Sequence, residues 1–446
     1  MAIEFLTDGV RAEYQTPEVG YSVGRAAVES LGIDNFVMVQ DTRHFNPELA
    51  EAVTDGLASL GANVIDMGIL PTPAAAITAD RLTRSSGEPY GAFSLSASHN
   101  PATDFGIKVF GAGGVKLNDE ETASLQHFAN NSGEAVRNPN KTLASRSYVE
   151  RLRKEYIDYL VATRHPGLDS DFLIGTKLVI DAANGAAYWS AAEALRGLGA
   201  DVQAINDNPL DEINKNSGAT HPETIMAEAT RTGRIGFAFD GDADRLLSVS
   251  ETGKKLDGDH AIHIAMLGEY QLSTTFPLKA VSTRYSNFGL RRSLWDYDIR
   301  VKEVINGDRA VAEAMGSSIP VGGEHSGHTL FNTVAHRLER VMSGDGTVTA
   351  IQLLGYAAEL GRSLDDMAMP VSYPRIEKTL KGIAPDAFET ELYMDVECKV
   401  VIEQGTEGDN LSRMSGTEKG VGRILVRDTD DDRAQWAIQV LEEAAR

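Results

Sequence analysis

The clearest indication of the fold is the segment FVMVQDTRHFNPELAEAVTDGLASLGANVID, which spans residues 36–66. Its first five residues, of which the first four are apolar, predict a strand. Residues 47–60 begin with a proline and are rich in Ala, Leu and Glu, so they predict a helix. Residues 62–66 predict a second strand. A strand, a helix and a second strand form a βαβ unit, whose two strands lie parallel in one sheet.

The same order of elements recurs twice further along the chain. Strands are predicted at residues 178–181, 201–205, 280–282 and 301–305, and helices at residues 190–197 and 290–295. Because βαβ units build parallel or mixed sheets covered by helices, we expect an α/β protein. It should contain three related α/β domains with mixed sheets around a central cleft, plus a smaller α+β C-terminal domain.

Changes in composition indicate where these domains begin and end. A polar stretch at residues 130–147 leads into a helix predicted at residues 148–163, which could bridge the first two domains. Two prolines within residues 370–374 indicate a linker, and a last helix is predicted at residues 432–445. The segment Asp257-Gly258-Asp259 separates the second domain from the third. The expected domains are residues 1–150, 151–256, 257–368 and 369–446.

The chain is strongly acidic, and this charge excludes some kinds of partner. Its 446 residues include 42 Lys and Arg against 65 Asp and Glu, which gives a formal net charge of −23. Binding to nucleic acid phosphates needs clustered cations, and an anionic membrane surface also attracts basic segments. We therefore expect neither a nucleic-acid partner nor a membrane partner.

Cysteine usage and the N-terminal segment indicate a cellular compartment. Cys398 is the single cysteine, so no intrachain disulfide can form and a reducing compartment is expected. Residues 1–8 carry acids and lack the apolar run of a signal peptide. No stretch approaches the ~18 apolar residues that a membrane helix needs. We expect a cytoplasmic protein.

The first candidate site is SASHNP at residues 96–101. An apolar run precedes it, so a strand should end in a tight loop with Ser98 at its tip. A serine beside a histidine, here His99, can act as a nucleophile or carry a phosphoryl group. Taken alone, such a pair is more often without function.

The second candidate is DGDADR at residues 240–245. Asp240, Asp242 and Asp244 would share one face of an extended segment. Three carboxylates so near one another would repel each other unless a cation lay among them. An EF-hand is excluded because Arg245 stands where that loop requires glycine and both flanks predict strands. A solvated acidic loop remains possible, but the pattern favours a Mg²⁺ site that also uses phosphate oxygens.

Two further loops carry polar groups suited to a phosphorylated sugar. In GGEHSGH at residues 322–328, Glu324, Ser326 and His328 suit sugar hydroxyls, whereas zinc is less favoured because no third histidine or cysteine is near. RMSGTE at residues 413–418 could cradle a phosphate, although a capped turn fits it equally well.

Two cations stand beside glycine-containing turns, Arg11 in TDGVR at residues 7–11 and Lys108 in DFGIK at residues 104–108. Either alone is more often surface charge. The chain contains neither the glycine pattern of dinucleotide-binding proteins nor a P-loop.

Together the five segments resemble the α-D-phosphohexomutase superfamily, over essentially the whole chain and in the family's order. Within it the chain is most similar to the bacterial phosphoglucosamine mutase family. The superfamily's phosphoserine loop resembles residues 96–101, and its metal loop resembles residues 240–245. Its sugar loop, Gly-Glu-x-Ser-Gly-His, resembles residues 323–328, and its phosphate loop, Arg-x-Ser-Gly-Thr-Glu, resembles residues 413–418. The segment Gly307-Asp308-Arg309 resembles the corresponding segment of phosphoglucosamine mutases.

The resemblance implies an isomerase that interconverts glucosamine 6-phosphate and glucosamine 1-phosphate through a bisphosphorylated sugar. Ser98 would carry the phosphoryl group. One Mg²⁺ per chain would be bound by the phosphorylated Ser98 with Asp240, Asp242 and Asp244, and a bisphosphorylated hexose would act as activator. The enzyme would be a monomer or a homodimer with a small phosphosugar substrate.

The resemblance also assigns roles to individual residues. The cations around the transferred group would be Arg11, Lys108, Arg245 and His328, while His99 orients the loop. Lys108 and His328 are both candidates for general acid or base. Residues implied in substrate binding are Glu324, Ser326, Arg309, Arg413, Ser415, Gly416, Thr417 and Arg423.

Two departures from the family pattern lie near these loops. Phe105 stands where asparagine is usual before Gly106, and Lys419 stands where the phosphate loop usually has proline. They leave open a sugar-phosphate-binding paralogue without turnover. A phosphomannomutase/phosphoglucomutase is the competitor of the same class, and a Mg²⁺-dependent phosphatase that uses the acidic loop is a third alternative.

Overall fold

The structure is a computed structural model that describes residues 3–5, 9–13, 17–133, 144–273, 277–332, 343–370 and 372. Residues 11–13 and four C-terminal strands are described by their backbone alone.

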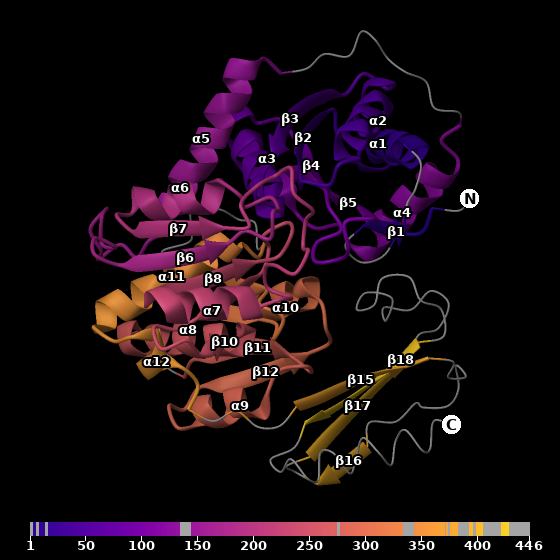
Figure 1. The fold of residues 1–446 in the computed structure, drawn as a ribbon. Helices are drawn as coiled ribbons and strands as arrows, with labels where there is room; N and C mark the ends of the chain where they lie inside the picture. The colour runs from indigo at the N-terminus through magenta and orange to yellow at the C-terminus, as the bar shows by residue number, and fades with distance from the viewer. Residues whose placement is uncertain are drawn as a thin grey trace.

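The first sheet contains the βαβ unit that the sequence predicts. Its strand order is β1-β5-β4-β2-β3, with β2 parallel to both neighbours and β5 antiparallel to β4 and β1 (Figure 1). The strands are β1 (Val10–Glu13), β2 (Asn35–Gln40), β3 (Asn63–Ile69), β4 (Tyr90–Leu95) and β5 (Asp104–Phe110).

The second and third sheets repeat this topology, so the expected mixed sheets are confirmed. Their orders are β10-β9-β8-β6-β7 and β12-β11-β13-β14. In each sheet three parallel strands, the first in sequence lying in the middle, are followed by an antiparallel strand. The strands are β6 (Lys177–Asp181), β7 (Asp201–Ile205), β8 (Ile235–Phe239), β9 (Leu246–Val249), β10 (Lys255–Leu256), β11 (Lys279–Thr283), β12 (Arg300–Val304), β13 (Val321–Gly323) and β14 (Thr329–Phe331).

The C-terminal region forms a fourth, wholly antiparallel sheet in the order β15-β18-β17-β16 (Figure 1). Cys398 begins one of its strands, whereas the helix predicted at residues 432–445 lies outside the described residues. The strands are β15 (Arg375–Lys381), β16 (Leu392–Asp395), β17 (Cys398–Gln404) and β18 (Val421–Arg427).

Helices cover both faces of the α/β sheets because the strands bury alternate side chains on opposite faces. In β2, Phe36 and Met38 belong to a core with α1, α2 and α4, whereas Val37 and Val39 belong to a core with α3 and α5. The helices are α1 (Pro17–Leu31), α2 (Asn46–Ala58), α3 (Thr72–Ser86), α4 (Asp119–Asn130), α5 (Arg146–Ala162), α6 (Ser190–Gly197), α7 (Glu223–Thr232), α8 (Gly258–Leu272), α9 (Phe288–Trp295), α10 (Asp308–Met315), α11 (Gly346–Leu360) and α12 (Leu364–Met367).

The three α/β sheets are joined by one continuous hydrophobic core. This core contains Val37 of β2, Ile180 of β6 and Ala280 of β11, each fully buried. The predicted helix at residues 148–163 is α5, which contacts both α3 and α6 and so connects the first sheet to the second. The sheets therefore cannot shift independently without disturbing shared packing.

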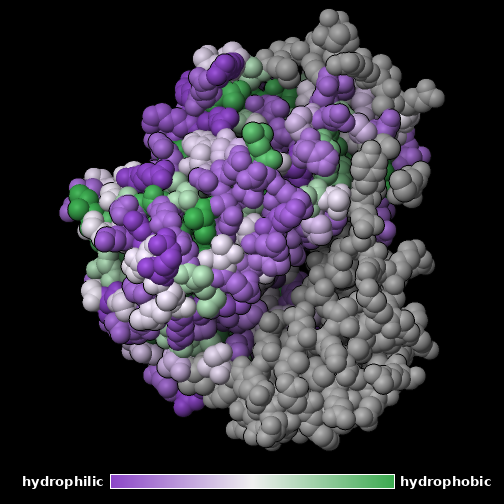
Figure 2. Space-filling model, viewed as in Figure 1, coloured by the Kyte–Doolittle hydropathy of each residue, from purple (hydrophilic) through white to green (hydrophobic). Residues whose placement is uncertain are grey.

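The visible face of the three α/β layers is mainly hydrophilic, and its hydrophobic residues are isolated (Figure 2). Within the described part of the chain, no helix has both the length and the apolar character needed to cross a membrane.

Candidate active site

Three of the five sequence motifs occupy equivalent positions in the three α/β sheets. In each sheet they form the loop between the third parallel strand and the antiparallel strand that follows it. Ser98 lies between β4 and β5, the three aspartates between β8 and β9, and the GEHSGH motif between β13 and β14. The repeated topology thus brings loops from three distant parts of the sequence to one place.

Ser98 lies at the centre of this arrangement. Its backbone is left-handed, with φ of 54°, and the residue is only 1% exposed. Its Oγ donates a hydrogen bond to Oδ2 of Asp240 at 2.7 Å and lies 3.3 Å from Nδ1 of His99. A strained, buried serine held against a carboxylate is typical of a functional site.

The serine loop is held from within by an ion pair that sequence reasoning missed. Arg43 is fully buried, pairs with Asp41 at 3.0 Å, and donates to the backbone carbonyls of Ser98, Asn100, Pro101 and Asp104. Asp41 also accepts a hydrogen bond from Ser96. The available signal was an Asp and an Arg directly after the predicted strand at residues 36–40, where polar side chains would meet a loop.

A second support comes from the other side of the serine loop. Nδ2 of Asn214 donates to the carbonyls of Ser98 and Asn100 at 2.8 and 2.9 Å. A Cβ on Gly241 would lie 2.6 Å from the Ser98 carbonyl oxygen, so only glycine permits this approach. The serine loop and the acidic loop are therefore in direct backbone contact.

The acidic loop is a tight turn, so the predicted extended segment was wrong, although the predicted clustering of its carboxylates is confirmed. The N–H of Ala243 donates to the carbonyl of Asp240, and Ala243 has φ of 56°. Asp240, Asp242 and Asp244 are buried and offer oxygens within 4.8 Å of one another. The flanking strands that excluded an EF-hand are present as β8 and β9.

The unused oxygens of these carboxylates fit a divalent cation. Oδ2 of Asp242 accepts from Thr72 Oγ1 at 2.6 Å and from Lys108 Nζ at 2.7 Å. Lys108 also donates to Oδ2 of Asp244 at 2.8 Å. Oδ1 of both aspartates is buried and has no hydrogen-bond partner among the described residues. Hard carboxylate oxygens in such a group suit Mg²⁺ or Ca²⁺.

The pKa values show that the nearby cations balance Asp244 but leave Asp240 poorly balanced. Burial, followed by the charges of Asp244 and Asp242, raises the pKa of Asp240 to about 8. The pKa of Asp244 is held well below its usual range, because Lys108 and then His328 outweigh the effect of burial. A bound cation would relieve the repulsion that Asp240 experiences.

Three of the predicted cations surround the acidic loop. Besides Lys108, Nη1 of Arg245 lies 3.0 Å from Nδ1 of His99, and its Nε lies 3.8 Å from carboxylates of Asp240 and Asp244. His328 is buried, with Nε2 3.2 Å from Asp308 and Nδ1 3.7 Å from Asp244. Burial opposes charge on this ring, but Asp308 and then Asp244 raise its pKa to about 10. His328 is therefore protonated on both ring nitrogens, and positively charged, at neutral pH.

The GEHSGH loop lies beside these groups and carries the polar side chains of Glu324 and Ser326. Oε1 of Glu324 accepts from the N–H of Gly307 at 2.9 Å, and Ser326 is exposed with Oγ 3.4 Å from Oε2 of Glu324. The N–H of Leu246, at the end of the acidic loop, donates to the carbonyl of Gly327 at 3.1 Å. The GEHSGH loop, called the sugar loop below, and the acidic loop are thus linked through their backbones.

Other predicted residues lie elsewhere or outside the described side chains. Arg309 forms ion pairs with Asp119 at 2.7 Å and Glu313 at 2.9 Å. Arg11 is placed by its backbone in β1, opposite Gly106, and Arg423 by its backbone in β18. Arg413, Ser415, Gly416 and Thr417 lie outside the described residues. Their predicted roles remain predictions.

Comparison with known proteins identifies relatives along the whole chain. Two family descriptions match, "Phosphoglucomutase/phosphomannomutase, alpha/beta/alpha domain I" at residues 2–135 and "domain III" at residues 257–372. The phosphoglucosamine mutase of Alkaliphilus oremlandii is 37% identical over 437 residues, covering 94% of both chains.

Solved structures have the same fold at lower identity. A phosphoglucomutase/phosphomannomutase family protein from Burkholderia thailandensis has a TM-score of 0.77 at 20% identity, covering 99% of this chain and 96% of the other. The Aspergillus fumigatus N-acetylphosphoglucosamine mutase, solved with GlcNAc-6P and magnesium, has a TM-score of 0.65 at 15% identity, covering 100% and 96%.

Proposed function

The chain belongs to the phosphoglucosamine mutase family, isomerases of the phosphohexomutase superfamily, and on that premise we propose how its residues interconvert glucosamine 6-phosphate and glucosamine 1-phosphate. The single observation that carries the mechanism is the 2.7 Å hydrogen bond between Ser98 Oγ and Asp240, within a buried cluster of three carboxylates and three cations. Such a cluster suits transfer of a dianionic group to and from the serine.

Ser98 is the phosphoryl carrier in this proposal. Its Oγ faces the acidic loop, and Arg43 and Asn214 fix the backbone on which it sits. A phosphoserine adds about −1.5 to −2 charges beside three carboxylates, so the site needs a cation. Asp240, Asp242 and Asp244 would hold Mg²⁺ with a phosphoserine oxygen, and the bound ion would neutralise charge and polarise the phosphoryl group. The magnesium in the Aspergillus enzyme complex supports this assignment.

The surrounding cations stabilise charge on the transferred group. Lys108 contacts Asp242 and Asp244, and Arg245 lies near Asp240 and Asp244. Preorganised charge of this kind is usually the largest contribution to phosphoryl transfer. His328 and Lys108 both carry protons here, so either can donate one to a departing sugar oxygen. After donating, the same group can accept a proton from the next hydroxyl that attacks.

The sugar would lie against Glu324, which is partly exposed, and Ser326, which is exposed. Its second phosphate would bind Arg413, Ser415, Gly416, Thr417 and Arg423, as the motif predicts. Transfer from Ser98 would give a bisphosphorylated sugar, which turns round and returns its other phosphate to Ser98. A bisphosphorylated hexose would therefore act as activator by phosphorylating Ser98.

The direct test is turnover of glucosamine 6-phosphate with Mg²⁺ and glucose 1,6-bisphosphate. We expect glucosamine 1-phosphate to form with the unaltered enzyme and no turnover with Ser98→Ala, because the carrier oxygen is gone. Ser85→Ala, an exposed serine on α3, is the matched control and should keep full activity. Mass spectrometry should find phosphate on the Ser98 peptide of the unaltered enzyme.

The same assay separates the alternatives. Turnover of glucose or mannose phosphates instead of the amino sugar would place the enzyme with the phosphomannomutase/phosphoglucomutases. Phosphate retained on Ser98 without any mutase activity would indicate a binding paralogue. Continuous release of inorganic phosphate would indicate a phosphatase. A cytoplasmic location, the absence of nucleic-acid and membrane partners, and a monomeric or homodimeric state remain predictions.

A further inference from the structure

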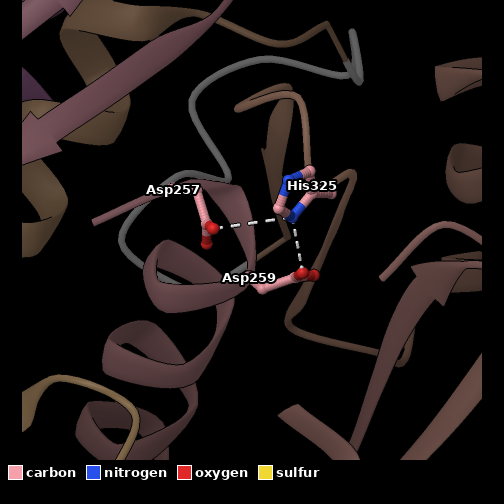
Figure 3. A group of neighbouring side chains, drawn as sticks. All are labelled: Asp257, Asp259 and His325. Carbon is pink, nitrogen blue, oxygen red and sulfur yellow. Dashed lines mark hydrogen bonds and ion pairs between the residues drawn. The ribbon is translucent and has the colours of Figure 1, made fainter. Parts of the chain in front are cut away.

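The sugar loop is fastened to the start of α8 by a histidine that the proposed mechanism does not use. Nδ1 of His325 lies 2.8 Å from Oδ2 of Asp259 and 3.5 Å from Oδ2 of Asp257 (Figure 3). Because a carboxylate can only accept, the ring must carry its proton on Nδ1 and donate to the aspartates. The two aspartates flank the first residue of α8, and His325 comes from the loop opposite.

Both aspartates are themselves fixed by other contacts. Asp257 is the N-cap of α8 and accepts from the N–H and Nδ1 of His260 at 3.2 and 2.8 Å. Asp259 is fully buried, and its Oδ2 also accepts from the N–H of Asn287, the N-cap of α9, at 2.8 Å. The two carboxylates that accept the hydrogen of His325 Nδ1 therefore have one orientation, which is set by the starts of α8 and α9.

The backbone of the sugar loop is pressed against the same turn of α8. The N–H of Gly258 donates to the carbonyl of His325 at 3.2 Å. A Cβ on Gly258 would lie 1.9 Å from the carbonyl oxygen of Glu324 and 2.7 Å from the nitrogen of Gly327. The loop can approach this closely because residue 258 has no side chain, and His325 closes the contact from the side.

We propose that His325 is a positioning residue, which locks the sugar loop onto the first turn of α8 and so sets where Glu324 and Ser326 meet the sugar hydroxyls. The inference rests on the proposed function for its substrate. The geometric part of the inference, that His325 fastens the loop to α8, does not depend on that function. His325 lies between these two residues in sequence, so rotation of its backbone would move both of them together.

The position of His325 separates this role from the transfer chemistry. Its ring contacts Asp257 and Asp259, whereas Ser98, the acidic loop and His328 form contacts of their own on the β8–β9 side. Loss of the His325 contact should therefore weaken sugar binding more than it lowers the rate of phosphoryl transfer. In kinetic terms KM should rise while kcat is nearly retained.

The test compares two substitutions of the same residue. His325→Leu keeps bulk but removes the donor, while His325→Asn places an amide N–H close to the position of Nδ1. For the leucine variant we expect about a tenfold rise in KM for glucosamine 6-phosphate with kcat changed less than about threefold. The asparagine variant should restore most of the affinity. His127→Leu, an exposed histidine on α4, is the matched control.

Hydrogen exchange gives a second readout that does not depend on activity. Backbone amides in a peptide covering residues 321–331 should exchange faster in His325→Leu than in the unaltered protein, and His325→Asn should return them toward the original rate. Asp259→Ala should reproduce the faster exchange, because it removes the acceptor that Asp259 offers to the ring. An unaltered thermal unfolding midpoint would show that the leucine variant is folded.

Three results decide the matter. Faster exchange with a KM effect, both reversed by asparagine, supports the inference. Equal exchange in all variants overturns it, even if the unaltered enzyme turns over glucosamine 6-phosphate. If the unaltered enzyme is inactive on hexose phosphates, the proposed function fails, and exchange alone still decides whether His325 fastens the loop.

Discussion

At the scale of single residues, the serine loop depends on a buried cation that takes no part in the motif itself. Arg43 donates to four backbone carbonyls of the loop while Asp41 balances its charge. An arginine suits this place because its planar group offers five donors in fixed directions. The strained φ of Ser98 is held by these contacts, since such a conformation costs about 1–3 kcal/mol unless its surroundings impose it.

Substitution of Arg43 tests this support. Arg43→Met should lower the free energy of unfolding by about 3–5 kcal/mol, because it leaves the Asp41 carboxylate buried without its partner. Burial already raises the pKa of Asp41, so the unpaired group would be still harder to ionise. Urea denaturation measures the change. Arg25→Met, which breaks a partly exposed pair with Glu29, should cost less than about 1 kcal/mol. Equal losses in both variants would contradict this role.

Lys108 is the second residue whose role can be separated by substitution. Lys108→Met should lower kcat by about 10²–10³-fold, the range found when a single charge-stabilising donor is removed. It should also tighten binding of a divalent cation, because Asp242 and Asp244 lose the charge that now balances them. Titration with Mn²⁺ followed by electron paramagnetic resonance would measure that affinity. Weaker cation binding would show that Lys108 organises the carboxylates instead of competing with the ion.

At the scale of elements, the starts of helices recur as the points where loops are held. Thr72 at the start of α3 donates to Asp242, Asp257 caps α8 below the sugar loop, and Asp345 caps α11. The first turn of a helix exposes backbone N–H groups and a partial positive charge, so carboxylates are stabilised there. The helices thus position the acidic residues as well as cover the sheets.

The cap of α11 predicts a pH effect on stability. Burial raises the pKa of Asp345 from 3.8 to about 6, even though Tyr156 donates to it at 2.8 Å. A raised pKa means that the folded state holds the proton more tightly, so this stabilisation is present below pH 3.8 and is lost as pH rises through about 6.

Asp345→Asn removes the titration while its amide oxygen can still accept from the N–H of Thr347. The stability of the unaltered protein minus that of the variant should fall by about 1–3 kcal/mol between pH about 4 and about 7.5. Urea denaturation across that range measures the difference. A difference that does not change with pH would show that Asp345 titrates normally.

At the scale of the whole molecule, the active site is assembled from separate sheets that share one core. Ser98 belongs to the first sheet, the aspartates to the second and His328 to the third, and the core residues beneath them are continuous. Further ion pairs connect the first and third sheets: Lys116 with Asp308, and Arg309 with Asp119. Cation binding at the junction should therefore stabilise the assembly as a whole.

Removal of divalent cations tests this coupling. A ligand that binds only the folded state at about 100 times its Kd adds about 2.7 kcal/mol, so chelation should lower the thermal unfolding midpoint by several degrees. Asp242→Ala should unfold at a midpoint that is much less sensitive to the chelator, because one carboxylate ligand is lost. Differential scanning calorimetry in Mg²⁺ and in EDTA measures both. An equal chelator effect in the variant would place the stabilising ion elsewhere.

Much of this protein was determined by local sequence. The apolar run at residues 36–39 and the Ala- and Leu-rich stretch after it produce β2 and α2, because strand and helix propensity act within a few residues. The prediction of the loops' chemistry was also local, since serine, three aspartates and a glycine-flanked glutamate indicated phosphoryl and sugar contacts by residue type. The helix near residues 148–163 was predicted for the same reason.

Only the tertiary structure decided which of these groups meet. The equivalent position of three loops in three sheets brings Ser98 to Asp240 across 142 residues of sequence, and no local pattern encodes that contact. Arg43, Asn214 and Thr72 act on the site through hydrogen bonds to distant segments, so their roles could not be read from neighbouring residues. The turn that contains Ala243 likewise packs against the serine loop at Gly241. Local propensity fixes elements, whereas shared burial and long-range hydrogen bonds fix their arrangement.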